Sequence, residues 1–132
     1  MDDTRWDFQA LIESHAVADR STRARVRGLV PWILEDPTRP HRIEHLAEHA
    51  AVSPRTLSRL FRRETGTSPA KFVERARLQL AQGLLERTGI RVDSIAVRSG
   101  FGTGERMRRA FRRALGLCPR AYASSGCGTI RR

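Results

Sequence analysis

The second half of this 132-residue chain contains an internal repeat. Residues 43–72, IEHLAEHAAVSPRTLSRLFRRETGTSPAKF, align with residues 92–122, VDSIAVRSGFGTGERMRRAFRRALGLCPRAY, and the second copy is one residue longer. Ile95 follows its match Leu46 by 49 positions, and Phe111 follows its match Phe61 by 50 positions. A repeat of this length is one supersecondary unit used twice, so both copies have to adopt the same local fold.

Each copy has the pattern of two helices joined by a tight turn. Apolar residues three and four positions apart give each segment one apolar face, which is the helical period. Ser53 and Thr103 fit the N-cap position of the second helix, and Pro54 fits its first position. Gly100 follows the first helix of the second copy, where a left-handed residue ends a helix at little cost. The spacing predicts a helix-turn-helix unit in both copies.

The glycines Gly100, Gly102 and Gly104 also suggest a phosphate-binding loop, which would make the chain an enzyme. A dinucleotide-binding fingerprint follows a strand, and its third glycine would fall at Glu105, a carboxylate where a phosphate has to bind. The segment before Gly100 has helical spacing instead. We therefore interpret the glycines as part of the turn between two helices, with Phe101 tucked under it.

The second helix of each copy is amphipathic, and its polar face is rich in arginine. The residues predicted to face inward are Leu57, Leu60, Phe61, Met107, Ala110 and Phe111. The formal net charge is +11, and residues 51–132 hold 18 of the 25 basic residues but only 5 of the 14 acidic ones. Every basic residue except Lys71 is an arginine, which suits forked contacts to phosphate and guanine. This charge favours a nucleic acid as partner, with an anionic membrane surface as the rival.

The rest of the chain is predicted to be helical too, so the expected fold class is all-α. Residues 8–16 have apolar residues at helical spacing. Pro31 removes one backbone hydrogen bond from a second stripe, so we expect a kink at Pro31 or a helix that restarts there. That stripe consists of Val26, Leu29, Val30, Ile33 and Leu34.

Composition and motifs argue against other classes of protein. No apolar run approaches the roughly 20 residues that cross a bilayer, and the acidic N-terminus is unlike a signal peptide, so we expect a cytoplasmic protein. Cys118 and Cys127 match no metal-ligand spacing and are expected to be reduced. Residues 41–45 match the H-x-x-E-H pattern of some metalloproteases, but His41 precedes the predicted helix. We expect no metal, no cofactor and no catalysis.

Both copies resemble the C-terminal DNA-binding module of the AraC/XylS family of bacterial transcription regulators. SPRTLSRLFRRETGTSPAKFVERARLQLAQGLLERT resembles the first recognition helix and linker helix of that family. SIAVRSGFGTGERMRRAFRRALGLCPRAY resembles the signature of its second half. The amino-acid sequence of these segments is most similar to that of family members whose N-terminal domain resembles the PfpI/glutamine-amidotransferase fold. These 132 residues contain no counterpart of that domain.

The resemblance implies two three-helix subdomains joined by a long linker helix. The linker would run from Pro69 to about Leu85, with one apolar stripe formed by Phe72, Ala76, Leu80 and Leu84. We expect the first subdomain at 21–67, the linker at 68–88 and the second subdomain at 89–122. Residues 1–20 would form a helical extension or the stub of a lost domain, and residues 123–132 would form a frayed tail.

A module of this family would insert the second helix of each copy into adjacent major grooves of double-stranded DNA, about 34 Å apart. By resemblance, base readout is assigned to Arg55, Ser58, Arg59, Glu105, Arg106 and Arg109. Phosphate contacts are assigned to Arg42, Thr56, Arg62, Arg63, Arg91, Arg108, Arg112 and Arg113. Arg42 and Arg91 begin the first helix of each copy, where we expect each to reach a phosphate bound at that N-terminus.

The chain departs from the family pattern at Ala51, Pro31, Cys118 and the segment after Tyr122. Ala51 stands where the family often has glycine, which costs the first turn up to about 1 kcal/mol. Cys118 replaces the usual serine before Pro119, which weakens that helix cap.

The leading hypothesis is a sequence-specific transcriptional regulator that is a monomer, binds double-stranded DNA and is able to touch RNA polymerase. One alternative is a truncated, non-enzymatic interaction module that sequesters a regulator, which predicts eroded polar faces on the second helices. Another is a non-specific nucleic-acid binder with little sequence preference. Residues 1–35 fit either a natural start or the remnant of a sensing domain.

Overall fold

The computed structural model describes residues 20–87 and 90–124. All regular elements in these two ranges are α-helices and neither range contains a strand, so the predicted all-α class is confirmed. None of the helices in these ranges is long and apolar enough to cross a membrane. Most of the predicted N-terminal segment 1–20, the tail from residue 125 onward and Cys127 lie outside the described residues.

The first helical stripe is interrupted at Gly28. Residues 20–27 are helical, and α2 (Leu29–Glu35) follows after Gly28, which keeps right-handed helical angles of φ −65° and ψ −15°. We expected the irregularity at Pro31, but it lies three residues earlier. Because α2 begins at Leu29, Pro31 lies in its first turn. The N–H groups of a first turn have no intrahelical partner, so the N–H that proline lacks is not needed there.

The burial of this stripe is as predicted except at its end. Val26, Leu29 and Ile33 are completely buried, and Val30 packs against them from the side. Leu34 is 49% exposed, so its assignment to the apolar stripe is wrong. One position beyond Ile33, its side chain has turned away from the buried face of the helix.

The repeated unit folds as the same helix-turn-helix in both copies. In the first copy α3 (Ile43–Ala50) precedes α4 (Pro54–Thr65), and in the second copy α6 (Val92–Arg98) precedes α7 (Gly104–Leu115). Both α4 and α7 contain 12 residues and end at a left-handed glycine. The predicted N-caps are present, since Ser53 Oγ accepts the N–H of residue 56 at 3.1 Å and Thr103 Oγ1 accepts that of residue 106 at 3.2 Å.

A left-handed residue forms the turn of each copy. Ala51 has a φ of 58° in the first turn, and Gly100 has a φ of 95° in the second. The segment before Gly100 is α6 and not a strand, so the surroundings of the glycines are those of a helix-turn-helix turn. Phe101 lies buried beneath this turn, as predicted.

The predicted linker helix is α5 (Pro69–Leu85), whose 17 residues span about 25 Å. The prediction of one apolar stripe along it is wrong, because α5 contributes to two separate cores. Val73 and Ala76 belong to the first core, whereas Leu78 and Ala81 belong to the second. Each residue turns a helix by about 100°, so these two faces lie about 140° apart around α5.

Each core is built from one copy of the repeat together with part of α5, and all six residues predicted to face inward are buried. An aromatic pair closes each core in the same way. Phe61 meets Phe72 edge to face at 5.5 Å between ring centroids, and Phe111 meets Tyr122 at 5.8 Å. Tyr122 lies on α8 (Pro119–Ser124), so residues 123 and 124 of the predicted tail are helical. The repeat in sequence is therefore a repeat in packing.

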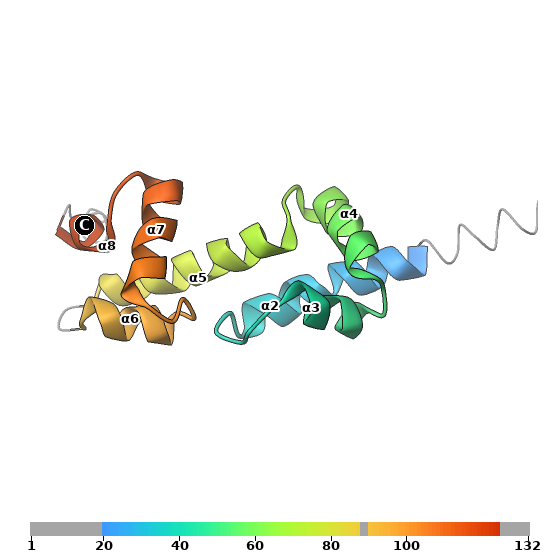
Figure 1. The fold of residues 1–132 in the computed structure, drawn as a ribbon, viewed down its shortest axis with the longest axis horizontal. Helices are drawn as coiled ribbons and strands as arrows, with labels where there is room; N and C mark the ends of the chain where they lie inside the picture. Colours follow the sequence, from blue (N-terminus) through green and yellow to red (C-terminus); the bar gives the residue numbers. More distant parts are fainter. Residues whose placement is uncertain (1–19, 88–89, 125–132) are drawn as a thin grey trace, which may run out of the picture.

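Figure 1 shows how the two units are arranged around α5. The linker helix crosses the middle of the molecule, and in this view α4 and α7 rise above it at opposite ends. α2, α3 and α6 lie on the other side of α5. The two arginine-rich helices therefore share one side of the molecule.

Candidate nucleic-acid interface

The polar face of α4 is fully available to a partner. Arg55, Ser58 and Arg59 are exposed, as are Arg62 and Arg63 one turn further on. The opposite face of α4 is anchored in the first core by residues that are at most 1% exposed, so the helix presents this face rigidly. Within the described residues no carboxylate pairs with any of these arginines, which leaves α4 with a strong local positive charge.

The polar face of α7 is exposed as well, but carboxylates pair with some of its arginines. Glu105 pairs with Arg109 at 3.1 Å and with Arg108 at 3.6 Å. Arg106 and Arg112 are exposed on the same helix. Ion pairs this exposed stabilise a protein by about 0–1 kcal/mol, so an approaching phosphate or base can replace them.

Other predicted phosphate contacts lie at helix starts. Arg42 and Arg91 are the N-cap residues of α3 and α6, with extended backbones and exposed side chains that make no capping hydrogen bond. Thr56 lies in the first turn of α4 and is half-buried, and its hydroxyl accepts a hydrogen bond from Ser53 Oγ at 3.0 Å. The first two arginines are thus free to move toward a ligand, whereas the threonine is already engaged.

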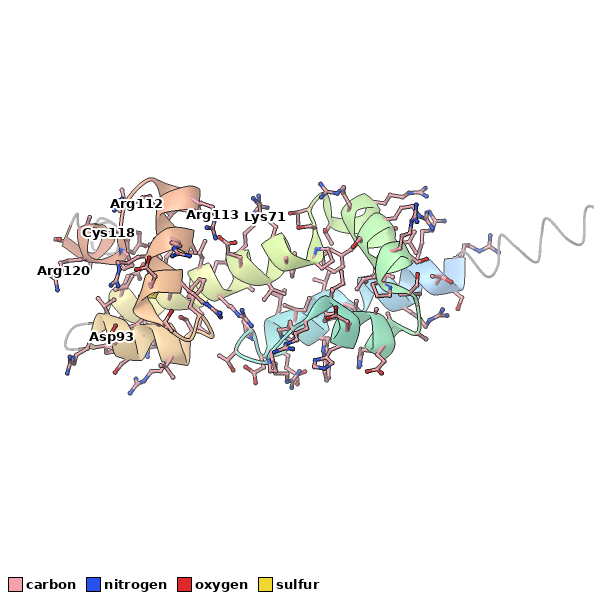
Figure 2. All side chains as sticks on the ribbon, in the orientation of Figure 1. Lys71, Asp93, Arg112, Arg113, Cys118 and Arg120 are labelled. Carbon is pink, nitrogen blue, oxygen red and sulfur yellow. The ribbon has the colours of Figure 1, made fainter. Side chains whose placement is uncertain are left out.

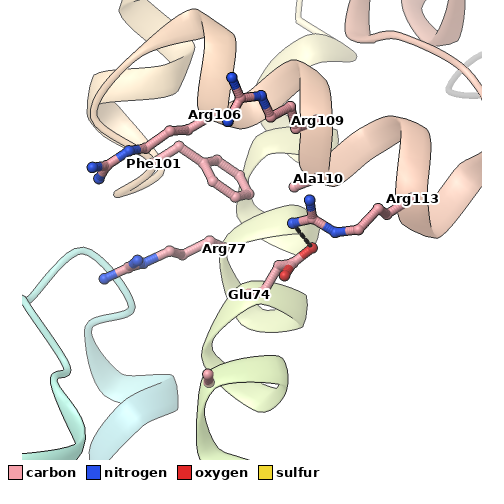
Figure 3. A pocket seen from close by; sticks show the side chains of 8 residues that line it. Glu74, Arg77, Phe101, Arg106, Arg109, Ala110 and Arg113 are labelled. Carbon is pink, nitrogen blue, oxygen red and sulfur yellow. Dashed lines mark hydrogen bonds and ion pairs between the residues drawn. The ribbon is translucent and has the colours of Figure 1, made fainter.

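A hollow of about 270 Å³ is lined by side chains of α7 and α5. Figure 3 shows Arg106, Arg109 and Arg113 on its α7 side, with Glu74 and Arg77 on its α5 side. Arg113 donates a hydrogen bond to the Glu74 carboxylate at 3.0 Å. Figure 2 shows that the Arg113 side chain extends on the same side of α5 as Lys71. The positive surface therefore continues from α7 along the linker helix, with one carboxylate inside it.

His41 of the H-x-x-E-H segment and the nearby His49 make structural contacts. His41 precedes α3, as predicted, and its ring Nε2 donates to the Asp36 carbonyl at 2.9 Å. Burial lowers the pKa of His41. His49 stacks on Trp32 with ring centroids 4.2 Å apart. The described residues contain no group of three or more histidine, cysteine, aspartate or glutamate residues placed to hold a metal ion.

Comparison with known proteins places this geometry in a family. A family profile described as a helix-turn-helix domain matches residues 46–125, which is more than half of the chain. The crystal structure of a probable AraC family transcriptional regulator from Rhodopseudomonas palustris superimposes with a TM-score of 0.67 at 31% identity, over 77% of this chain and 96% of the other. This chain belongs to the AraC-type helix-turn-helix family.

Two further proteins are similar to this AraC-type chain. The DNA-binding domain of the global transcriptional factor AdpA, crystallised with a target DNA, has a TM-score of 0.74 and 37% identity, over 81% of this chain and 95% of that domain. The HTH-type transcriptional regulator Rv1931c of Mycobacterium tuberculosis is 49% identical over 82 residues, which are 62% of this chain and 32% of that protein. The chain spans about a third of the length of the curated relatives that it matches.

Sequence reasoning about this AraC-type chain did not single out Glu74 or Arg77. Both lie on α5 and make contacts with residues 38 to 40 positions away, which helical periodicity does not encode. One signal was present for Arg77, because a cation between the core residues Ala76 and Leu78 needs a partner when it is half-buried.

Proposed function

We propose that this chain is a sequence-specific DNA-binding transcriptional regulator that inserts α4 and α7 into adjacent major grooves of double-stranded DNA. The observation that carries the proposal is the pair of equivalent, exposed, arginine-rich helices on one side of α5. An α-helix fits the major groove, and arginines on its exposed face reach both base edges and phosphates. The similarity to the AdpA domain, which was crystallised on DNA, supports the same role.

The proposed division of labour follows the family pattern. Base edges would be contacted by Arg55, Ser58, Arg59, Glu105, Arg106 and Arg109. Phosphates would be contacted by Arg42, Thr56, Arg62, Arg63, Arg91, Arg108, Arg112 and Arg113. Arginine donates two hydrogen bonds to guanine O6 and N7, and a glutamate accepts one from the amino group of cytosine. The pairing of Glu105 with Arg109 would orient both side chains before binding.

The remaining parts of the proposal concern the whole protein. The chain would act as a cytoplasmic monomer, without catalysis, and RNA polymerase would be a second partner. Its two subdomains would correspond to 21–67 and 89–122, joined by the linker 68–88. The amino-acid sequence resembles that of family members with an amidotransferase-like N-terminal domain. We therefore also propose that the nearest relatives of this chain carry such a domain.

In-vitro selection of bound duplexes at about 0.15 M salt tests this function. We expect one enriched bipartite sequence, bound far more tightly than a scrambled duplex. Arg59→Ala and Arg109→Ala should each cost about 1–3 kcal/mol on the selected site and little on the scrambled one. Arg98→Ala, on the exposed part of α6, is the matched control that removes the same charge elsewhere.

Two outcomes of this selection distinguish the alternatives. Equal losses on every sequence would identify a non-specific nucleic-acid binder. No binding to any duplex would favour the interaction module that sequesters a regulator.

For Arg42→Ala and Arg91→Ala we expect the slope of log affinity against log salt to fall by about 1 each. Unchanged slopes would refute the phosphate contacts assigned to these two N-cap residues.

A further inference from the structure

Arg77 connects the middle of α5 to a loop of the first subdomain. Its Nε donates to the Pro37 carbonyl at 2.8 Å, and its Nη2 donates to the Arg39 carbonyl at 2.7 Å. These carbonyls belong to the loop between α2 and α3, and Figure 3 shows the Arg77 side chain extending from α5 toward that loop. The side chain is half-buried, so both hydrogen bonds are partly shielded from water. Hydrogen bonds to a charged donor are among the stronger ones in proteins.

The turn of the second subdomain meets the same point from the other side. A β-carbon on Gly100 would lie 2.9 Å from Arg77 Nε, 2.9 Å from Thr38 Cα and 3.0 Å from the Pro37 carbonyl oxygen. Real β-carbons essentially never come this close to backbone atoms. The second turn, the α2–α3 loop and the Arg77 guanidinium are therefore in direct contact, and glycine is required there for packing as well as for its φ of 95°.

The first subdomain uses an arginine in the comparable place differently. Arg25 immediately precedes the core residue Val26, as Arg77 precedes the core residue Leu78. Arg25 Nε donates to the carbonyl of Ala50, at the end of α3 in its own subdomain. Arg77 lies beside the equivalent turn of the second subdomain but donates across to the first. An arginine that donates to a backbone carbonyl thus links two helices of one subdomain in the case of Arg25, and links the two subdomains to each other in the case of Arg77.

We propose that Arg77, Gly100 and the α2–α3 loop form a clamp that holds the two helix-turn-helix subdomains at one separation, so that the chain selects DNA sites whose two halves have one spacing. The inference rests on the proposed function for its DNA part and on the contacts alone for its mechanical part. Arg77 acts as a positioning residue in this clamp.

The linker helix alone leaves this separation poorly defined. Helices bend, and a bend of about 10° at the centre of a helix about 25 Å long displaces one end by about 2 Å relative to the other half. A hydrogen bond to a base tolerates only a few tenths of an ångström. A contact beside the helix centre, such as the clamp, resists this bending. A shift of one base pair on DNA is larger still, about 3.4 Å along the axis with about 35° of rotation.

A measurement without DNA tests the mechanical part in the full chain. Spin labels attached after Arg63→Cys and Ala114→Cys, at exposed positions of α4 and α7, report the distance between these helices. Cys118→Ser and Cys127→Ser first remove the native thiols. We expect one narrow distance distribution for the parent and a broad one for Arg77→Ala. Arg75→Ala, an exposed arginine on the same helix, should match the parent. An unchanged distribution in Arg77→Ala, with helicity intact by circular dichroism, overturns the clamp.

A binding measurement tests the selection of spacing. Duplexes carry the selected site with one or two base pairs added or removed between its halves, and the chain without labels is used. Arg77→Lys keeps the charge but loses the forked geometry, so we expect about tenfold weaker binding at the selected spacing and a smaller preference for that spacing. Arg75→Ala should weaken binding at all spacings alike and leave the preference unchanged.

The outcomes separate the clamp from the proposed function. If Arg77→Lys keeps the full preference for one spacing, α5 alone sets the separation and the inference is wrong. If no duplex binds to the parent, the proposed function and the spacing claim fail together. The distance measurement still decides in that case whether the clamp exists.

Discussion

Gly100→Ala is expected to destabilise the chain much more than Gly102→Ala, although the two glycines have almost the same φ angle. Their φ angles are 95° and 91°, so an alanine is strained at both positions. That strain costs about 1–2 kcal/mol for a left-handed residue with a β-carbon. The difference between the two variants therefore reports mainly what surrounds the added methyl group.

The surroundings differ sharply. Within the described residues, nothing lies within 4 Å of a β-carbon on Gly102, whereas one on Gly100 would lie 2.9 Å from Thr38 Cα and 3.0 Å from the Pro37 carbonyl oxygen. Overpacking against atoms that cannot move away costs about 1–3 kcal/mol. We expect a loss in the free energy of unfolding of about 2–5 kcal/mol for Gly100→Ala, against about 1–2 kcal/mol for Gly102→Ala.

Urea unfolding followed by circular dichroism measures both losses, because the loss of helix reports unfolding of the described fold. The slope of the free energy against urea should stay the same in both variants, which shows that the two-state comparison holds. Equal destabilisation by the two substitutions would refute the reasoning. It would mean that the second turn does not press on the α2–α3 loop in solution.

Glu74→Gln should tighten DNA binding severalfold and steepen its salt dependence by about one phosphate contact, because it releases Arg113 from a carboxylate 3.0 Å away. Fluorescence anisotropy across a salt series measures the affinity, and weaker binding would contradict this prediction. Cys118→Ser should raise the free energy of unfolding by about 0.5–1 kcal/mol. Cys118 Sγ accepts the N–H of Ala121 at 3.4 Å, and a serine oxygen is the better acceptor at this helix cap. An unchanged free energy of unfolding in urea would refute this prediction. Burial lowers the pKa of His41 below its ordinary value of 6.5, so the unfolded chain binds the extra proton and stability should fall as the pH drops below about 6.5. His41→Gln should flatten that pH dependence in urea unfolding, and an unchanged slope would assign it to other groups.

The elements of this fold could be predicted because their signals are local. The N-caps Ser53 and Thr103, the proline at the first position of α4 and the helical spacing of apolar residues lie within one or two turns of the structure that they determine. The repeat added a check, because each copy had to satisfy the same pattern. The buried faces of α4 and α7 followed from these signals, whereas the linker helix and its bounds were expected from the family resemblance.

What the sequence did not predict involves contacts between distant segments. One stripe on the linker was the natural expectation for a helix with one core, but α5 serves two cores and gives each about one turn. The pairing of Glu74 with Arg113, 39 positions apart, has no signature in spacing. Leu34 is apolar and adjacent to the buried Ile33, but one further residue of helical rotation turns it away from the core. The roles of individual arginines toward bases and phosphates stay predictions.

The two faces of α5 have a consequence for how such a chain can change over time. Inserting one residue between Ala76 and Leu78 would rotate everything after it by about 100° and advance it by about 1.5 Å. Seven inserted residues would nearly restore the rotation but would carry α7 about 10 Å further along, close to three base pairs of duplex. The centre of α5 therefore tolerates exchanges of side chains far better than changes in length. In the proposed mode of DNA binding, the spacing between the two half-sites changes whenever the length of this one helix changes.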